Sequence, residues 1–480
     1  MTDTLPEAQW NALVRRVDWR FLLQLDEAPR VLTPAADALG QAARTVLATA
    51  DDGRPELAVL RRPTRAELDE AAEHVTGGGH VYAEWPLVRP SAARRRLAAA
   101  GFRDVRCYER WPRGAPQLWL PVDAPRSTAA FLATRGNSVR QRLQRRAWRL
   151  AVRLNLPLPL SAVGRTAGGP SDEGRTWALL TGGRSSINKV VGLVLTPQGP
   201  ELAVKFARTE RDEAPLRHEA EVLRAVERRR PELPGVPRVA FVGSRCGRIA
   251  VGETFVHGRP LSDRLGPDSL QPLAVAVTQW LVGLAGDAPV VPRAVWWERL
   301  VETSLATLER QHAGVVAPDE LAAARTALAA LPDLPLVVEH RDCSPWNVLV
   351  DRSGAPAVVD WESAEPDGLP GVDLAYFLTY ASLFHDRAPE LPAALASYQR
   401  SLDPATSTGR VVAECESLYC ERLGLAPTVL APLRLLCWVV HCRSEFRLAE
   451  LEAAGAPAHE RLSRGLFLAL FRSELRRQQP

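Results

Sequence analysis

Lysine is almost absent from this chain. Of its 60 Lys and Arg residues only two are lysines, Lys189 and Lys205, which lie sixteen positions apart. A compact ammonium group and a planar guanidinium group are not interchangeable. Because arginine has replaced lysine nearly everywhere else, these two positions are candidates for a specific role of an ammonium group, with an ordinary strand lysine as the alternative.

Other absences narrow the class of protein. No run of eighteen apolar residues occurs, so the sequence predicts no transmembrane segment. The seven cysteines are odd in number and contain no Cys-x-x-Cys pair, which argues against a disulfide framework and a zinc site. The first residues lack a basic-then-apolar signal, so we expect a cytoplasmic protein. A net charge of +4 is too small to indicate a nucleic-acid partner.

The most informative motif lies between residues 340 and 362. It reads His-Arg-Asp-Cys-Ser-Pro-Trp-Asn-Val-Leu-Val, and Asp-Trp-Glu begins thirteen positions after the Asn. Phosphoryl transfer needs a carboxylate near the attacking hydroxyl and oxygen ligands for Mg²⁺. Asp342 fits the first role, and Asn347 and Asp360 fit the second. The apolar segments around the intervening turn predict a hairpin that holds both metal ligands on one base.

An apolar strand carries the second lysine. The sequence Leu-Ala-Val-Lys-Phe ends at residue 206 and matches the Ala-x-Lys strand of kinases, whose lysine contacts the α- and β-phosphates. The helical segment 216–226 follows and offers a carboxylate partner for Lys205. Glu219 is the better candidate for this partner, and Glu221 is the alternative.

A glycine turn lies at 182–186, two predicted strands before the strand that carries Lys205. Backbone N–H groups in such a turn can cradle phosphates. The residues of the turn that we select for this role are Gly182, Gly183, Ser185 and Ser186. Lys189 fits either a phosphate contact or an ordinary strand position.

Together these motifs resemble the aminoglycoside phosphotransferase and choline kinase family, which has Asp-Trp-Glu where protein kinases have Asp-Phe-Gly. The resemblance covers about residues 172–480. It implies an α+β, protein-kinase-like bilobal fold, with a β-rich N-lobe at 171–258 and a helical C-lobe at 259–480. It also implies transfer of the γ-phosphate of ATP, with Mg²⁺, to a small-molecule hydroxyl. In this family the edge strand and hinge hold adenine, which would place Glu253 and Phe255 at the adenine edge.

The segment after the second motif Asp bears on the acceptor. Only thirteen positions separate Asp360 from Asp373, and no Ala-Pro-Glu motif follows, whereas a protein substrate requires a long activation segment. We therefore expect a small-molecule acceptor, and we expect Asp373 to tie the catalytic loop to the helix that begins there. Glu362, Glu365 and Asp367 would suit a cationic acceptor such as an aminosugar or choline, or else form a solvated turn.

Residues 1–125 alternate between predicted strands and helices, which is typical of a small α/β domain. Segment 28–122 weakly resembles the second half of a class I methyltransferase. The turn at 33–38 lacks the glycines with which a methyltransferase backbone approaches its cofactor. We interpret the domain as a degenerate, cofactor-free relative, with an unrelated α/β domain as the alternative.

The segment 126–170 is expected to hold a basic helix and a linker, because no Asp or Glu occurs from Ala124 to Ser171. One face of the predicted helix is apolar and is surrounded by arginines. That face comprises Val139, Leu143, Ala147, Leu150 and Leu154. A basic amphipathic helix over 139–154 can contact an anionic membrane surface or an acidic partner. The alternatives are that this stripe packs against a neighbouring domain, and that the whole protein is a nucleotide-binding regulator or scaffold.

Overall fold

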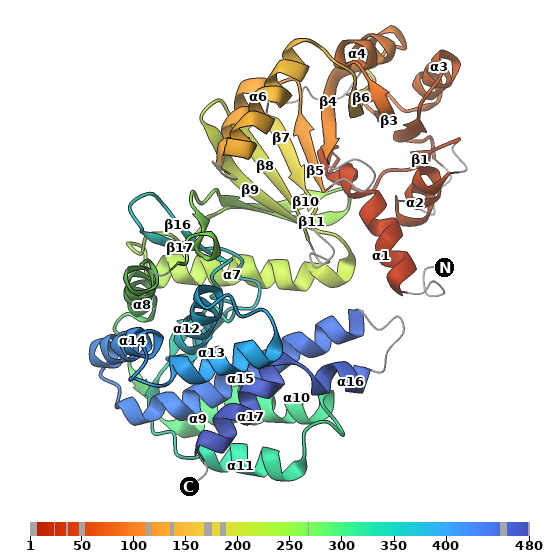
Figure 1. Ribbon diagram of the computed structural model, residues 1–480. Helices are drawn as coiled ribbons and strands as arrows, with labels where there is room; N and C mark the ends of the chain where they lie inside the picture. Colours follow the sequence, from red (N-terminus) through yellow and green to blue (C-terminus); the bar gives the residue numbers. More distant parts are fainter. Residues whose placement is uncertain are drawn as a thin grey trace. The chain divides into compact units, whose positions relative to one another are not determined.

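Two compact units make up the protein, and neither is contiguous in the chain. Unit 1 comprises Met1–Ala220 and Arg238–Phe255, and unit 2 comprises Glu221–Pro237 and Val256–Pro480. One large sheet and many helices confirm the expected α+β class (Figure 1). The computed structural model describes residues 7–23, 25–34, 37–47, 53–111, 117–134, 139–167, 175–182, 189–266, 268–451 and 458–478.

Eleven strands form one continuous sheet in unit 1, in the order β1-β2-β3-β6-β4-β5-β7-β8-β9-β11-β10 (Figure 1). The strands are β1 (Val31–Leu32), β2 (Leu57–Arg61), β3 (His80–Val88), β4 (Arg103–Trp111), β5 (Leu118–Pro121), β6 (Leu158–Arg165), β7 (Thr176–Leu180), β8 (Lys189–Thr196), β9 (Gly199–Ala207), β10 (Val239–Arg245) and β11 (Arg248–Thr254). Strands β1, β2 and β3 run parallel, and all the other neighbouring pairs are antiparallel.

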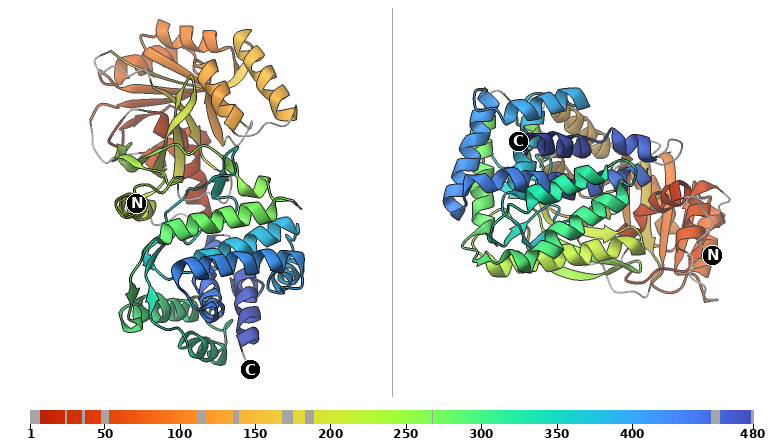
Figure 2. Two further views of the ribbon diagram at one scale, coloured as in Figure 1. Left: turned by 90° about the vertical axis from the view of Figure 1, so that its left-hand side faces the viewer. Right: turned by 90° about the horizontal axis from the view of Figure 1, so that it is seen from below.

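Helices cover both faces of this sheet (Figure 2). They are α1 (Glu7–Arg16), the 3₁₀ helix η1 (Asp18–Leu22), α2 (Ala38–Leu47), α3 (Arg65–His74), α4 (Pro90–Ala99), α5 (Pro125–Thr134), α6 (Val139–Arg153) and the first part of α7 (Glu213–Arg229), up to Ala220. Successive strand residues point to opposite faces. Val59 and Tyr82 therefore pack under η1 and α2, whereas Ala58 and Val81 pack under α3 and α4. Burial on both faces explains why these strands are apolar without alternation.

The strand β6 differs most from the sequence-based expectation. Residues 126–170 were expected to hold a helix and a linker, yet β6 lies inside the sheet between β3 and β4. Pro157 and Pro159 indicate a break because proline cannot donate a ladder hydrogen bond. The sheet accommodates Pro159 through a shift of register between Trp85 and Val88 on the opposite strand.

The structure shows no break between units near residue 125. Strand β5 pairs with β7, so the sheet passes from the N-terminal region into the predicted N-lobe. Trp19 stacks on Tyr82 with ring centroids 3.7 Å apart, and Phe21 stacks on Phe206 at 4.7 Å. All four rings belong to one apolar core. Residues 1–125 are therefore part of the same compact unit as the predicted N-lobe.

A buried ion pair also joins these two stretches of unit 1. Asp18, which is 1% exposed, accepts hydrogen bonds from Arg208 Nε at 3.0 Å and Nη2 at 2.9 Å. Arg208 Nη2 also donates to the carbonyl of Thr181 at 2.8 Å. A buried charge that loses its partner is strongly destabilising. Asp18 thus helps to hold the residues that follow β7 and β9.

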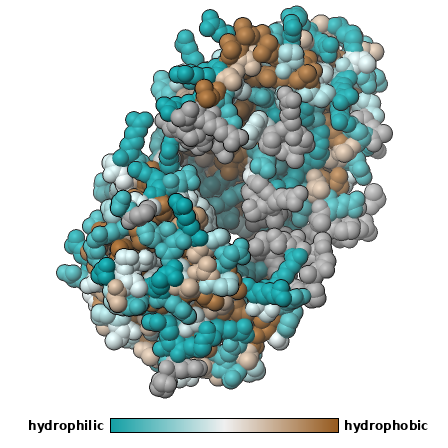
Figure 3. All heavy atoms as spheres, in the orientation of Figure 1, coloured by the Kyte–Doolittle hydropathy of each residue, from teal (hydrophilic) through white to brown (hydrophobic). Residues whose placement is uncertain are grey.

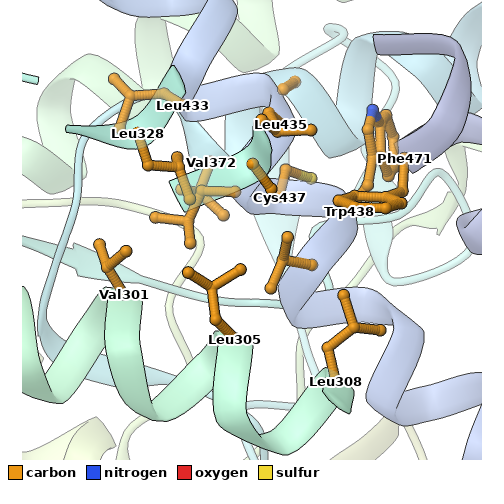
Figure 4. Close-up of a cluster of buried hydrophobic side chains, with 14 of the residues drawn as sticks. Val301, Leu305, Leu308, Leu328, Val372, Leu433, Leu435, Cys437, Trp438 and Phe471 are labelled. Carbon is orange, nitrogen blue, oxygen red and sulfur yellow. The ribbon is translucent and has the colours of Figure 1, made fainter. Parts of the chain in front are cut away.

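Unit 2 is built mainly of helices. They are α8 (Leu270–Ala285), α9 (Arg293–Trp297), the π-helical turn η4 (Glu298–Glu302), α10 (Thr303–Gln311), α11 (Pro318–Leu328), α12 (Val372–His385), α13 (Leu391–Ser401), α14 (Ser407–Leu423), α15 (Leu430–Leu451), α16 (Ala458–Ser463) and α17 (Leu466–Gln478). Figure 4 shows the core where Leu305 of α10, Val372 of α12, Trp438 of α15 and Phe471 of α17 meet.

No single helix in the described ranges is long and apolar enough to cross a membrane. One bent pair of helices, 407–423 with 427–446, has the length and the apolar composition of a membrane span. Buried helices in a protein core can have the same two properties.

Short strands in unit 2 carry the catalytic motif. The predicted hairpin is confirmed, because β16 (Val348–Val350) pairs antiparallel with β17 (Pro356–Val358). Strand β12 (Arg259–Pro260) pairs with β16, and β15 (Val337–Glu339) pairs with β18 (Glu365–Gly368). The hairpin begins directly after the motif Asn and ends just before the second motif Asp, which sets the geometry described next.

Candidate active site

Asp373, in the first turn of α12, fixes the backbone of the catalytic loop. Its Oδ2 accepts a hydrogen bond from the N–H of His340 at 2.5 Å, and its Oδ1 accepts one from the N–H of Arg341 at 2.8 Å. Arg341 adopts a φ of 60°, a conformation that residues other than glycine seldom take. Burial, with repulsion from Glu339, raises the pKa of Asp373 to about 7. The predicted tie between loop and helix is therefore present.

The side chain of His340 is a buried anchor of the same loop. Its Nδ1 accepts a hydrogen bond from the N–H of Asp342 at 3.2 Å, and its Nε2 lies 3.2 Å from the carbonyl of Val359. These contacts assign the proton to Nε2. The Trp361 ring lies edge-on to His340, with centroids 4.7 Å apart. His340 thus positions the backbone of Asp342 and is not placed to act as a base itself.

The carboxylate of Asp342 is held by two side chains. Asn347 Nδ2 donates to its Oδ2 at 2.8 Å, and the hydroxyl of Tyr376 donates to its Oδ1 at 3.3 Å. Burial raises the pKa of Asp342 to about 7, and the negative charge of Asp360 acts in the same direction. A carboxylate that titrates near neutral pH is suited to receive a proton from a hydroxyl group.

Asn347 and Asp360 flank one end of the hairpin, since the N–H of Val359 donates to the carbonyl of Asn347 at 3.1 Å. Asn347 Nδ2 also donates to the carbonyl of Asp342 at 3.0 Å, so both amide hydrogens are engaged and only the amide oxygen is left for a cation. Asp360 has a φ of 76°, an uncommon conformation that recurs at functional sites. An amide oxygen beside carboxylates is a donor set that fits Mg²⁺.

In unit 1, Lys205 lies between two buried carboxylates. Its Nζ contacts Glu219 Oε1 and lies 3.0 Å from Glu253 Oε2. Glu219 is fully buried, whereas Glu221 is exposed, so the structure selects Glu219 as the partner. Burial raises the pKa of Glu253 to about 7, although the charge of Lys205 opposes this shift. The cluster fixes the ammonium group at one place on β9.

The glycine turn is described only in part. Gly182 follows β7 and adopts a φ of 68°, which glycine tolerates without strain. Gly183, Ser185 and Ser186 lie outside the described residues. Lys189 begins β8, where it pairs in register with Ala207.

The predicted adenine edge forms part of the sheet. The N–H of Thr254 donates to the carbonyl of Arg238, and the N–H of Phe255 donates to the carbonyl of Glu201, each at 2.9 Å. These two donors are therefore engaged within unit 1. The side chain of Glu253 contacts Lys205, a contact that no local sequence pattern indicates. Contact of Glu253 and Phe255 with adenine stays a prediction.

Two residues near Asp342 were not selected from the sequence. Tyr376 lies one helical turn after Asp373, a spacing that places both on one face of α12. Trp346 lies within the catalytic loop itself and is 40% exposed, which is unusual for so large an apolar side chain. The one-turn spacing from Asp373 could have identified Tyr376 in the sequence, and the position within the catalytic loop could have identified Trp346.

A second group of possible metal ligands lies in the helices of unit 2. The ligand atoms of His312, Cys442 and Glu445 lie within 4.8 Å of one another. Glu445 also accepts hydrogen bonds from the N–H of Phe467 at 2.6 Å and of Leu468 at 3.3 Å. Unpaired N–H groups at a helix start need such acceptors. This role at the start of α17 accounts for the position of Glu445, and we assign the group to packing.

One family model matches part of the chain. The model described as "Phosphotransferase enzyme family" matches residues 179–410. No curated protein sequence matches the chain. The family match includes none of segment 28–122, so its methyltransferase resemblance stays a prediction.

Several solved structures are similar to the chain. The GDP and kanamycin complex of APH(2")-IIia is 13% identical, with a TM-score of 0.37 over 62% of this chain and 92% of that one. Macrolide 2'-phosphotransferase MphH from Brachybacterium faecium is 17% identical, with a TM-score of 0.37 over 58% and 87%. A thermostable mutant of APH(4)-Ia with AMP-PNP and hygromycin B is 15% identical, with a TM-score of 0.40 over 63% and 95%.

Proposed function

We propose that the protein is an ATP- and Mg²⁺-dependent phosphotransferase acting on a hydroxyl group of a small molecule, because residues 179–410 match the model of the phosphotransferase enzyme family. One observation carries this proposal. The carboxylate of Asp342 is held by Asn347 and Tyr376 at the end of the hairpin that also carries Asp360. The candidate acceptors are aminoglycosides, aminosugars, choline-like molecules and sugars.

The reaction assigns a task to each group. The acceptor oxygen forms a bond to the γ-phosphorus, the bond from that phosphorus to the bridging oxygen breaks, and ADP leaves with the bonding electrons. The hydroxyl proton passes to Asp342, which also orients the acceptor. Lys205 neutralises charge on the nucleotide phosphates. Asn347 and Asp360 would hold Mg²⁺, which would supply positive charge to the phosphates. Such catalysis depends mainly on positioning and electrostatics.

The direct experiment measures ADP release by the purified protein with ATP and Mg²⁺. The acceptor panel contains aminoglycosides, aminosugars, choline and sugar alcohols. We expect ADP release that depends on an acceptor and stops when EDTA removes the metal. Without the metal ion, the carboxylate and amide oxygens of the site offer no positive charge to the phosphates. A regulator or scaffold would instead bind ATP and release no ADP with any acceptor, and that result would reject the proposal.

Replacing Glu219 by glutamine is expected to lower turnover by roughly tenfold or more, because Lys205 loses a charge-assisted hydrogen bond that fixes its position. The measurement is the steady-state rate with an accepted substrate. Glu221→Gln is the matched control, since Glu221 lies two positions away but is exposed. Equal rates for the two variants would contradict the role given to Glu219.

A second candidate function is favoured by the surface of α6. Three residues of the apolar stripe are exposed, since Leu143, Leu150 and Leu154 are 58%, 55% and 58% exposed, and this disfavours the alternative in which they pack against a neighbouring domain. Trp148 and Ala151 pack against the sheet instead. In the orientation of Figure 1, Figure 3 shows hydrophobic residues at the surface near the helix labelled α6. We propose that this stripe, with its exposed arginines, contacts an anionic membrane surface.

Vesicle sedimentation tests this contact. We expect the protein to bind phosphatidylglycerol vesicles more tightly than phosphatidylcholine vesicles, since each basic residue near an anionic surface contributes about 1 kcal/mol. Leu150→Glu should weaken binding by roughly tenfold, because it places a charge in the apolar stripe. Leu87→Glu is the matched control, as Leu87 lies in unit 1 and is 56% exposed. Equal binding to both vesicle types would exclude the contact.

A further inference from the structure

An apolar cavity lies beside the catalytic loop within unit 2. Its volume is about 510 Å³, which is in the range of sites for small molecules. Trp346 of the catalytic loop, Tyr380 and Phe384 of α12, and Leu391 and Ala394 of α13 contribute to its wall. We call this cavity the aromatic pocket. Because Trp346 lies only four positions after Asp342, a molecule in the pocket lies against the loop that carries the proposed base.

Aromatic contacts connect the pocket to Asp342. The Trp346 ring lies edge-on to Tyr380, with centroids 4.9 Å apart, and 6.0 Å from the ring of Phe384. Tyr380 lies 4.9 Å from Tyr376, whose hydroxyl donates to the carboxylate of Asp342. Trp346 and Phe384 are 40% and 38% exposed, so each keeps apolar surface that a ligand can cover. The row of rings thus runs from the pocket to the proposed base.

The charges around the pocket do not suit a polycation. Among the residues that the structure describes, none that lines the pocket is acidic, and two of them, Arg387 and Arg464, are basic. An ammonium group that is buried without a carboxylate partner carries a large desolvation cost. A molecule with several ammonium groups therefore finds no compensating charge among these side chains.

The acidic residues after the motif are also occupied. Glu365 pairs with Arg299 at 2.8 Å, and Asp367 pairs with Arg229 at 2.9 Å. Both partners are arginines, so each carboxylate already has a cationic partner within unit 2. The expectation that these acids suit a cationic acceptor loses two of its three residues.

We propose that the aromatic pocket receives the hydrocarbon or aromatic body of the acceptor, and that the acceptor is an apolar alcohol, neutral or anionic, instead of a polycationic aminosugar. The inference rests on the proposed function for its chemistry. The acceptor hydroxyl gives its proton to Asp342, its oxygen forms the bond to the γ-phosphorus, and ADP leaves. The aromatic wall supplies the apolar contact that holds the rest of the molecule.

The test compares 2-naphthylethanol and decanol with kanamycin and choline. Binding is measured by calorimetry, and ADP release is measured with ATP and Mg²⁺. We expect lower KM and Kd values for the two apolar alcohols. Phe384→Glu should raise both values by about tenfold or more for those alcohols, since it places a charge in the pocket wall. Val295→Glu is the matched control, because Val295 is 65% exposed in unit 2 and does not line the pocket.

Trp346→Ala provides a second variant that keeps the surface uncharged. We expect it to raise KM for naphthylethanol about tenfold, with a smaller change in kcat, because it removes contact area and leaves Asp342 in place.

The outcomes separate this inference from the proposed function. Phosphorylation of kanamycin or choline with lower KM values than the alcohols, unaffected by Phe384→Glu, would reject the apolar acceptor and keep the phosphotransferase. Calorimetric binding of the alcohols that Phe384→Glu abolishes, without ADP release, would keep the pocket and reject the phosphotransferase. Absence of alcohol binding to the wild-type protein would overturn the inference.

Discussion

Replacing Asp342 by asparagine is expected to lower the rate of phosphotransfer about a thousandfold while the protein stays folded, because general-base catalysis contributes on the order of 10² to 10⁴ in rate. The asparagine side chain has nearly the same shape, and its single oxygen can still accept from one of the two donors, Asn347 or Tyr376, but it cannot take up the acceptor proton. The measurement is kcat with a saturating acceptor, together with circular dichroism to verify the fold.

A matched substitution tests whether the loss of activity is specific to Asp342. Asp351→Asn lies in the same hairpin, where an exposed carboxylate accepts hydrogen bonds from the N–H groups of Ser353 and Ala355. An amide oxygen can accept both, so activity should stay near the wild-type value. If Asp342→Asn kept comparable activity, another group would have to receive the proton.

Replacing Lys205 by methionine is expected to lower both activity and stability. Activity should fall roughly 10²- to 10³-fold, as is common when one preorganised charge is removed from a transition state. Stability should fall by about 3 to 5 kcal/mol, because the buried carboxylates of Glu219 and Glu253 lose the ammonium group that both of them contact. The measurements are kcat and denaturant unfolding.

The free energy of unfolding of Lys205→Met should depend on pH in a definite direction. Burial already raises the pKa of Glu253 to about 7 in the wild-type protein, and without Lys205 the pKa should rise further. A carboxyl whose pKa is higher in the folded state binds more protons when folded, so the free energy of unfolding falls as pH rises from about 4.5. Lys205→Met should therefore be less stable at pH 8 than at pH 5.

A double variant separates the two effects. Lys205→Met with Glu253→Gln removes one of the two buried charges, so we expect it to recover much of the stability but none of the activity. Recovery of activity together with stability would show that Lys205 has only a structural role.

Local patterns predicted much of the fold. One of the helices that the alternating pattern of residues 1–125 predicts is α3, and the hairpin on either side of the turn at 351–354 is present. Helical and strand periodicity act over a few residues, so they are visible in sequence. The position of β6 was not visible, because Pro159 resembles a breaker and only pairing with β3 and β4 shows its true role.

The residues of the candidate site also fall into two groups, those that local spacing predicts and those that only the folded structure brings together. Asp342, Asn347 and Asp373 were found because fixed spacings within one stretch of chain bring them together. The contact of Glu253 with Lys205 was missed, since it depends on the register of β9 against β11. The ion pair of Asp18 with Arg208 joins residues 190 positions apart, and no local pattern indicates such a partner.

The place of β6 in the sheet has a consequence for synthesis. Strands β3 and β4 are made first, yet they are not neighbours, because β6 pairs with both. Until residue 165 has left the ribosome, each of them has an edge with unpaired N–H and C=O groups, which is a template for pairing with other chains. Growing chains are therefore most vulnerable to association with one another while α5 and α6 are being translated.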